Sequence, residues 1–234
     1  MKCGSGAFMK TSIQSTQLAR EMVDIGRKCN RNVSAFVTDM STPVGYAIGN
    51  KLEVIEAVDV LKGRDIPDLK KLSLTLSAEM ISLSLNINTS VALCIAKRML
   101  ESGKAFEKFK EMVVAQGGDV RCIQDTSFLL SNTYSLEIIA ENDGYIYELD
   151  ALLLGKAFVV LGAGRNIKTD NIDYDAGIVL SVKKGDKISK GNAIMTLYSS
   201  KESKLKDAEI LAKASYEISN IAPQNEPLII DYIR

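Results

Sequence analysis

The chain has no histidine and no tryptophan, only 4 prolines, and 4 cysteines that are scattered without a Cys-x-x-Cys pair. The absence of histidine excludes zinc sites of the Cys/His kind and every catalytic scheme built on imidazole. We expect the cysteines to be free thiols in a reducing compartment rather than a disulfide framework. They are Cys3, Cys29, Cys94 and Cys122.

An excess of charge of either sign is also missing, because 29 lysines and arginines balance 29 aspartates and glutamates. No basic surplus is available to bind nucleic acid or an anionic membrane surface, so a small-molecule or protein partner is favoured. The longest apolar runs, such as 157–163, are far shorter than the roughly 20 residues that span a bilayer, and no apolar signal core is present. We therefore expect a cytoplasmic protein.

What the chain contains indicates an α/β fold. Apolar residues recur at helical spacing over 11–28, and a short buried strand is predicted over 32–39. A loop follows, and Asn50 is a plausible N-cap for a helix that ends at Gly63. Residues 68–116 are predicted to be helical, with breaks near 86–88 and at 102–103.

Beyond Gly117-Gly118 the pattern becomes rich in strands. Strands over 135–140 and 145–149 are predicted to form a hairpin around residues 142–144. Further strands are predicted over 177–182, 193–198 and 227–233, and helices over 152–161 and 201–219. The sequence thus predicts a partial α/β domain over 1–125, which includes the helical block 68–116, followed by an α+β domain over 126–234.

Two glycine motifs, Gly4-Ser5-Gly6 and Gly162-Ala163-Gly164, have the composition of anion-binding loops. Neither carries the full dinucleotide or P-loop pattern. A tight strand-to-helix connection is favoured for the first motif and a helix C-cap for the second.

Three carboxylates, Asp39, Glu53 and Glu56, lie close together in the sequence. Glu53 and Glu56 are three residues apart on one helical face, so they can share a partner. The spacing alone favours a solvated helix face. The backbone carbonyls of the preceding loop, 44–47, could instead join a carboxylate in binding a hard cation.

The segment 177–191 has the glycine and valine spacing of a biotinyl or lipoyl hairpin module. A carrier domain also needs an exposed lysine beside methionine or acidic neighbours at the tip of the hairpin, and none stands there. A barrel-sandwich shape is therefore expected without carrier activity.

Several motifs taken together resemble the pyrimidine nucleoside phosphorylases of the thymidine phosphorylase family, in the same order as in that family. They lie at Lys2 to Met9, Thr38 to Met40, Gly45 to Ala57, Ser102 to Ala105, Ala115 to Asp119, Asp143 to Tyr145, Gly162 to Arg165 and Ile172 to Gly177. The resemblance covers essentially the whole chain and identifies it as the C-terminal half. It implies a C-terminal α+β domain similar to a barrel-sandwich hybrid.

The resemblance implies a pentosyltransferase, a glycosyltransferase of pyrimidine nucleoside salvage. It would reversibly cleave thymidine, uridine or deoxyuridine with inorganic phosphate as co-substrate and without an organic cofactor. The family's phosphate contacts lie in Lys-His-Ser-Thr-Gly-Gly and Thr-Gly-Gly-Thr segments, and this sequence contains neither. We therefore expect no catalytic residue in this chain and no activity from it alone.

The resemblance implies roles for four residues. Phe8 matches a phenylalanine that lines the base pocket, although a core aromatic is an equal alternative. Val44, Ala47 and Glu56 match positions that bind a structural potassium ion through two backbone carbonyls and one carboxylate. The remaining ligands, and the surface that forms the family's homodimer, belong to the half that is missing.

Two alternatives remain open. The chain could be a non-catalytic half that acts as an interaction or structural module, or a carrier-like scaffold, which the missing lysine disfavours. Strand 32–39 needs neighbouring strands on one side, which we expect from the missing half through complementation.

Overall fold

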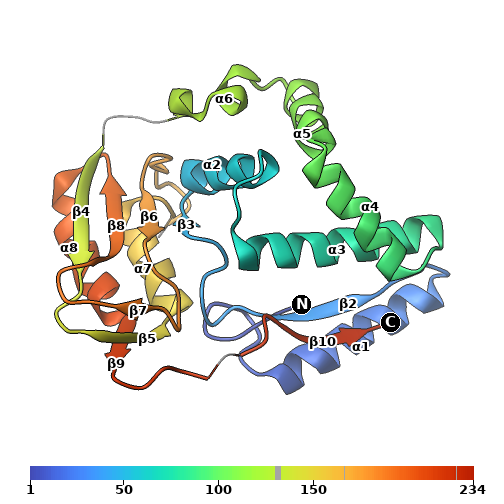
Figure 1. Cartoon of the computed structure of the whole chain (residues 1–234), viewed down its shortest axis with the longest axis horizontal. Coiled ribbons are helices and arrows are strands. Elements are labelled where there is room, and N and C mark those ends of the chain that lie inside the picture. The colour runs from blue at the N-terminus through green and yellow to red at the C-terminus, as the bar shows by residue number, and fades with distance from the viewer. Residues whose placement is uncertain (130–132, 166, 225) are drawn as a thin grey trace.

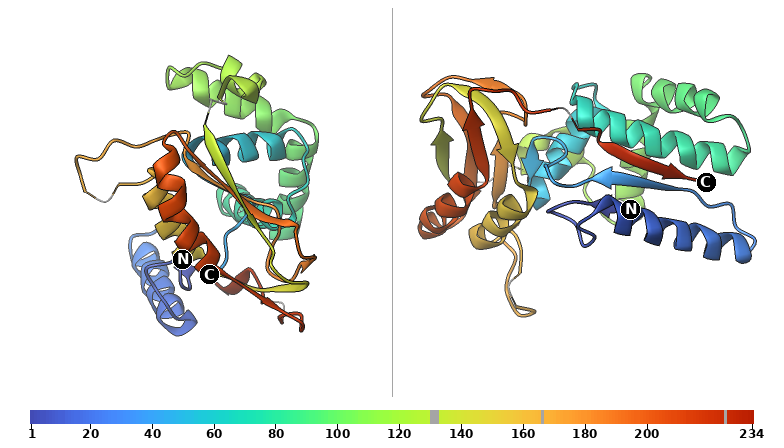
Figure 2. Two further views of the ribbon diagram at one scale, coloured as in Figure 1. Left: turned by 90° about the vertical axis from the view of Figure 1, so that its left-hand side faces the viewer. Right: turned by 90° about the horizontal axis from the view of Figure 1, so that it is seen from below.

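The computed structural model describes residues 1–234 apart from 130–132, 166 and 225. It is a mixed α and β structure in which helices accompany several sheets (Figure 1). Both chain ends lie in the same layer, while most residues after position 133 form a module at the other end of the molecule (Figure 2).

The first layer is a sheet of order β1-β2-β10, in which β1 is parallel and β10 antiparallel to β2. Helix α1 packs against β2 and β10. Its side chains Ala19 and Val23 are buried, and Val37 of β2 is buried beneath it. The elements are β1 Lys2–Cys3, α1 Ser12–Lys28, β2 Ala35–Asp39 and β10 Ile229–Ile233. The expectation that the missing half supplies strands on one side of β2 is therefore wrong, because β1 and β10 of this chain pair with β2 on its two sides.

Helices occupy the predicted block 68–116, and their ends follow local signals. Asn86 has a left-handed backbone with φ of 53°, Asn88 caps the next helix by accepting from Ser90 N–H, and Gly103 has φ of 73°. The elements are α2 Asn50–Leu61, α3 Pro67–Leu85, α4 Thr89–Glu101, α5 Lys104–Ala115, α6 Arg121–Gln124 and the 3₁₀ helix η1 Thr126–Leu129.

The second region contains two sheets, of order β3-β6-β8-β4 and β7-β5-β9. Helices α7 and α8 pack on each other, and α8 packs on β4 and β8. The larger core lies here, with Ile146, Leu154 and Leu197 fully buried. The elements are β3 Ala47–Ile48, β4 Tyr134–Ile139, β5 Gly144–Leu149, α7 Ala151–Leu161, β6 Gly177–Leu180, β7 Lys187–Ile188, β8 Ala193–Ser199, α8 Glu202–Ala214 and β9 Tyr216–Ser219.

The predicted hairpin of 135–140 with 145–149 is wrong. Strand β4 pairs with β8, whereas β5 pairs with β7 and β9 in the other sheet. The reason is that Ala140 and Asp143 form their hydrogen bonds with residues 190–192. The predicted helix 201–219 is also too long, because α8 ends at Ala214 and β9 follows it.

The division at 125/126 stays a prediction, and two strands pair across it. Strand β3 joins β6, and β10 joins β2. Among the described helices none is by itself long and apolar enough to span a membrane; only α3 and α4 together, bent by 119°, reach that length and composition.

Candidate functional site

The segment Pro43 to Ala47, here called the 43–47 segment, lies where α2, the start of α3 and the turn 183–186 meet. It leads from β2 into β3 and holds Gly45 with φ of 72°. Two carboxylates and one ammonium group contact its backbone, so its conformation is fixed by charged side chains from three separate elements.

Glu56 of α2 contacts the segment from one side. Its Oε1 accepts N–H from Tyr46 at 2.7 Å and from Ala47 at 3.2 Å, and the residue is only 6% exposed. Burial raises the pKa of Glu56 above its ordinary value, while the two backbone N–H groups and the charge of Lys183 oppose that rise. A Cβ at Gly45 would stand 2.2 Å from Glu56 Oε2, so a glycine is needed there.

Asp68 and Lys183 contact the segment from the other side. The Lys183 ammonium donates to the carbonyls of Pro43 and Gly45 and lies 2.8 Å from Asp68 Oδ2, which also accepts Gly45 N–H at 3.0 Å. Burial alone would raise the pKa of Asp68, but the hydrogen bond and charge of Lys183 outweigh it and hold that pKa below its ordinary value.

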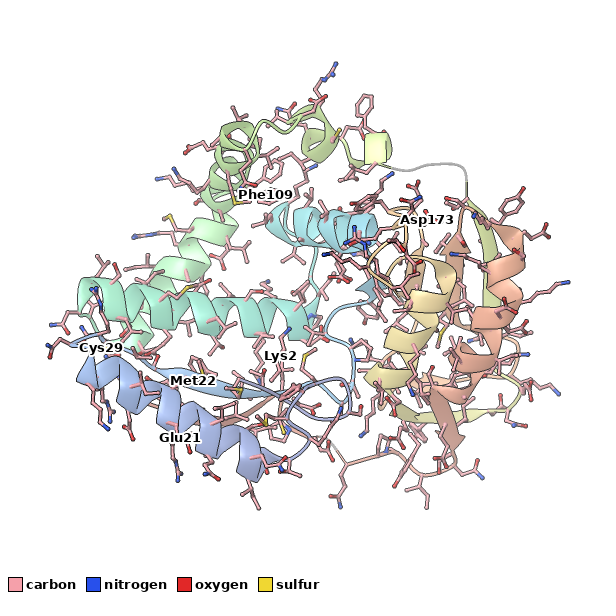
Figure 3. The ribbon with its side chains drawn as sticks, turned by 180° about the vertical axis from the view of Figure 1, so that it is seen from behind. Lys2, Glu21, Met22, Cys29, Phe109 and Asp173 are labelled. Atoms are coloured by element: carbon pink, nitrogen blue, oxygen red, sulfur yellow. The ribbon has the colours of Figure 1, made fainter. Side chains whose placement is uncertain are left out.

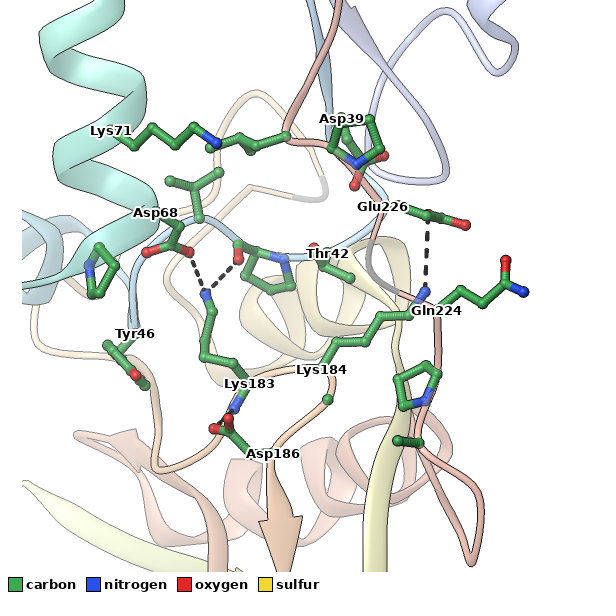
Figure 4. A pocket seen from close by; sticks show the side chains of 18 residues that line it. Asp39, Thr42, Tyr46, Asp68, Lys71, Lys183, Lys184, Asp186, Gln224 and Glu226 are labelled. Carbon is green, nitrogen blue, oxygen red and sulfur yellow. Dashed lines mark hydrogen bonds and ion pairs between the residues drawn. The ribbon is translucent and has the colours of Figure 1, made fainter.

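The local sequence sets these positions. Pro67 begins α3 and places Asp68 in its first turn. The turn at 183–186 is closed by Asp186 N–H donating to Lys183 O and by Asp186 Oδ2 accepting Lys183 N–H. Lys183 thereby points from the strand-rich module toward the segment (Figure 4).

A cleft of 860 Å³ opens beside this cluster. Its wall includes Asp39, Thr42, Lys71 and Lys184, with prolines at 43, 67, 223 and 227 (Figure 4). Lysines and carboxylates both line it, so the cleft favours neither a purely anionic nor a purely cationic ligand.

The structure separates the three carboxylates that the sequence grouped. Asp39 ends β2 and accepts Ser41 N–H at 3.0 Å, beside the cleft. Glu53 is exposed and accepts N–H from Gly49 at 3.1 Å, at the start of its own helix. Because Glu56 binds other groups, the predicted shared partner of Glu53 and Glu56 is not found among the described residues.

Both glycine motifs serve as connections. Gly4, Gly6 and Ala7 donate their N–H groups to Met9, Met40 and Gly4 carbonyls, so they are not available to an anion. Gly162 caps α7 in a left-handed conformation with φ of 102°. Between α7 and β6, Asp173 accepts from Ser200 and lies near α2 in Figure 3.

Phe8 follows Gly4-Ser5-Gly6, and its side chain is 93% exposed. The core-aromatic alternative is therefore wrong for this chain. Its assignment to a base pocket stays a prediction.

Comparison with known proteins bears on the whole chain. Residues 145–219 match the model of the pyrimidine nucleoside phosphorylase C-terminal domain. The chain is 41% identical over 231 residues to a pyrimidine-nucleoside phosphorylase of Bacillus subtilis (strain 168), covering 98% of this chain and 53% of that protein. It is 40% identical to that of Staphylococcus haemolyticus (strain JCSC1435), covering 100% and 53%, and 40% identical to that of Geobacillus stearothermophilus, covering 100% and 54%.

The chain belongs to the pyrimidine nucleoside phosphorylase family. It contains the family's C-terminal domain and spans about half the length of the curated relatives it matches.

The potassium ion that the family resemblance implies would lie against the backbone of the 43–47 segment. The carbonyls of Pro43 and Gly45 accept hydrogen bonds from the Lys183 ammonium, and the carbonyl of Tyr46 accepts Leu180 N–H at 2.8 Å. The carbonyls of Val44 and Ala47 accept no hydrogen bond in the part of the chain that the structure describes, apart from any within a strand ladder. These are the two carbonyls that the resemblance selects.

The strand register agrees with this assignment. Ala47 faces Val179 of β6 in a non-hydrogen-bonded pair, because the neighbouring pair, Tyr46 with Leu180, carries the hydrogen bond. The backbone groups of Ala47 therefore point away from β6, to the side where Glu56 accepts its N–H. Two backbone carbonyls and one carboxylate are oxygen ligands of the kind that hard cations take. No group of three or more His, Cys, Asp or Glu side chains in the described residues is arranged to hold a metal.

Sequence reasoning missed Asp68 and Lys183. They are distant in sequence, and no local pattern links them. The only available signals were the helix start at Pro67 and the Lys184-Gly185-Asp186 turn, which predict exposed positions rather than a half-buried contact.

Proposed function

We propose that this chain is the C-terminal half of an enzyme that reversibly cleaves pyrimidine nucleosides with phosphate, and that it is inactive alone. The observation that carries the proposal is the 41% identity to the Bacillus subtilis pyrimidine-nucleoside phosphorylase over 98% of this chain. A phosphate oxygen forms a bond to the anomeric carbon as the bond from that carbon to the base nitrogen breaks. The base leaves with the bonding electrons and takes up a proton, and the sugar 1-phosphate remains.

Phosphate is itself the nucleophile, so the enzyme's task is to position two substrates and to stabilise the charge that develops. The proposed contributions of this chain are Phe8, at the base pocket, and the Val44 and Ala47 carbonyls with the Glu56 carboxylate, which would hold potassium. That ion would supply a fixed positive charge to the backbone around it. The finer fold assignment, a barrel-sandwich hybrid in the C-terminal domain, and the cytoplasmic location belong to the same proposal.

The complementary half is the partner that we propose for the first layer. Helix α1 carries Ile13 at 79% exposed and Ile25 at 61% exposed, and β1 is the edge strand of its sheet. Exposed apolar side chains next to a sheet edge favour association. Met22 on the same helix, labelled in Figure 3, is 54% exposed. A homodimer is proposed for the complete enzyme only.

The test is reconstitution. The chain is purified alone, and also after co-expression with the part of the Bacillus subtilis relative that it does not match. Release of uracil or thymine from the nucleoside is followed with and without phosphate. We expect no release by either part alone and phosphate-dependent release by the pair, since losing even one charge-stabilising donor costs roughly 10²–10³ in rate.

Two results would change the proposal. Phosphorolysis by the chain alone would contradict its inactivity. A stable but inactive pair would favour the alternative of a non-catalytic interaction module, which the exposed apolar residues of α1 also support.

A further inference from the structure

The Lys183 ammonium lies in a shell of oxygen atoms. A protonated lysine has three N–H donors, and three acceptors surround this one: the Pro43 carbonyl at 2.6 Å, the Gly45 carbonyl, and Asp68 Oδ2 at 2.8 Å. Its Nζ also lies 5.3 Å from the centre of the Tyr46 ring. The lysine side chain is 19% exposed, so this shell is largely shielded from water.

The shell resembles that of a small cation, with two backbone carbonyls and a carboxylate. A partly buried ammonium in such a shell gains charge-assisted hydrogen bonds at every donor, which are stronger than neutral ones. Because Pro43 and Gly45 are held through their carbonyls, the carbonyl of Val44 between them is directed elsewhere. The orientation of the backbone at Val44 therefore depends on Lys183.

We propose that Lys183 is a positioning residue whose ammonium group fixes the 43–47 segment from within, before any metal ion binds. Two charged side chains then hold the backbone of this segment on opposite sides. Lys183 donates to carbonyls of the segment, and Glu56 accepts from N–H groups of the segment. The Val44 and Ala47 carbonyls are left for a further ligand. The inference deepens the proposed potassium site, but its variants are compared in potassium-free buffer.

Lys184 provides a matched control. It is the next residue of the same turn and lines the same cleft, yet its Nζ lies 4.0 Å from Glu226 and has no hydrogen bond to the 43–47 segment among the described residues. Removing Lys184 changes the charge of the turn as much as removing Lys183 does. It leaves the oxygen shell intact.

The experiment measures amide hydrogen exchange in the full chain in potassium-free buffer. The informative amides are those of Gly45, Tyr46 and Ala47, which donate to Asp68 and Glu56. The variants are Lys183→Met, Lys183→Arg and Lys184→Met. Amides of β8 serve as the reference for global opening.

We expect Lys183→Met to speed exchange of the three amides by at least about tenfold while β8 is unchanged, because the opening is local. Lys183→Arg keeps the charge and the donors and is expected to restore most of the protection. Lys184→Met is expected to behave as the unmodified chain. If Lys183→Met also speeds exchange in β8, Asp68→Asn replaces it and is read at the Tyr46 and Ala47 amides, since that change removes the negative charge from the shell and leaves the lysine in place.

Two results would overturn the proposal. One is unchanged exchange at residues 45–47 in both Lys183→Met and Asp68→Asn. The other is an unmodified chain whose three amides exchange fast without potassium and slow about tenfold when it is added, because the metal ion and not Lys183 would then order the segment. Neither readout involves catalysis, so a failed reconstitution would not affect it.

Discussion

The hydroxyl of Tyr232 donates a hydrogen bond of 2.8 Å to Oε1 of Glu79, joining β10 to α3 across 153 positions of sequence. Glu79 is 4% exposed, and the Tyr232 ring packs against Phe36 at 4.8 Å between centroids. Burial, followed by the hydrogen bond and charge of Glu79, raises the pKa of Tyr232 above its ordinary value. The last strand is thus anchored to the helical layer as well as to its sheet.

Tyr232→Phe keeps the ring but removes the donor to a buried carboxylate. We expect the free energy of unfolding to fall by roughly 1–3 kcal/mol, the usual cost of leaving a buried polar group unpaired. Urea denaturation measures it. Tyr174→Phe is the control, because Tyr174 is 56% exposed and its loss should matter little. Equal stability of Tyr232→Phe and the unmodified chain would mean that this contact does not hold β10.

Gly45→Ala is expected to destabilise the chain more than Gly185→Ala. Both glycines have a positive φ, 72° and 96°, so both variants carry backbone strain. A methyl group meets nothing within 4 Å at Gly185, but at Gly45 it would stand 2.2 Å from Glu56 Oε2. Glu56 can move only by losing its two backbone hydrogen bonds, so we expect an additional cost of about 1–3 kcal/mol. Thermal or urea unfolding of the two variants compares them, and equal losses would contradict the packing.

Asp68 predicts a pH dependence of known sign. Its pKa in the folded chain lies below the ordinary value of 3.8, so its contribution to stability is present above pH 3.8 and is lost as pH falls through the lowered folded pKa. The difference in free energy of unfolding between the unmodified chain and Asp68→Asn should therefore shrink in that acidic range. Asp65→Asn, which removes a more exposed partner of Lys70, is the control. A difference that is independent of pH would disprove the role of the Asp68 charge.

Helix α5 and strand β8 are predicted to differ strongly in hydrogen exchange. No residue of α5 is buried, and Val114 is 61% exposed, whereas Ile194, Met195 and Leu197 of β8 are fully buried. Amides of α5 should exchange through small local openings and those of β8 only through large ones. Mass spectrometry of deuterated peptides resolves the two segments. Similar protection in both would show that α5 is covered in solution, for example by a second copy.

The sequence predicts elements whose ends are set by local chemistry. Thr11 caps α1 by accepting Gln14 N–H, Asp150 caps α7, and the left-handed residues Asn86 and Gly103 separate the helices of 67–115. The strand with which another strand pairs is not set by local sequence. Strand β10 was expected as a closing strand, but nothing in residues 227–233 reveals that it pairs with β2.

The candidate site shows the same limit. The family resemblance predicts Glu56 and the carbonyls of Val44 and Ala47 as ligands, because they lie within one stretch of sequence, 44–56. Lys183 could not be, since its contact with Asp68 requires the strand-rich module and the helical layer to be already packed together. Long-range charge pairs depend on tertiary structure, which single-sequence patterns do not contain.

The pairing of β10 with β2 affects the order in which parts of the chain can fold during translation. A ribosome delivers β2 before the strand-rich module, and the strand that completes its sheet, β10, emerges only after that module has been made. The core of that module lies mainly within residues 138–212, so the module can fold before β10 completes the first sheet. Domains ordinarily fold in order from the N-terminus, and here that order would be reversed. Until residues 229–233 arrive, one side of β2 stays open, and the nascent chain carries an exposed strand edge while the strand-rich module is being made.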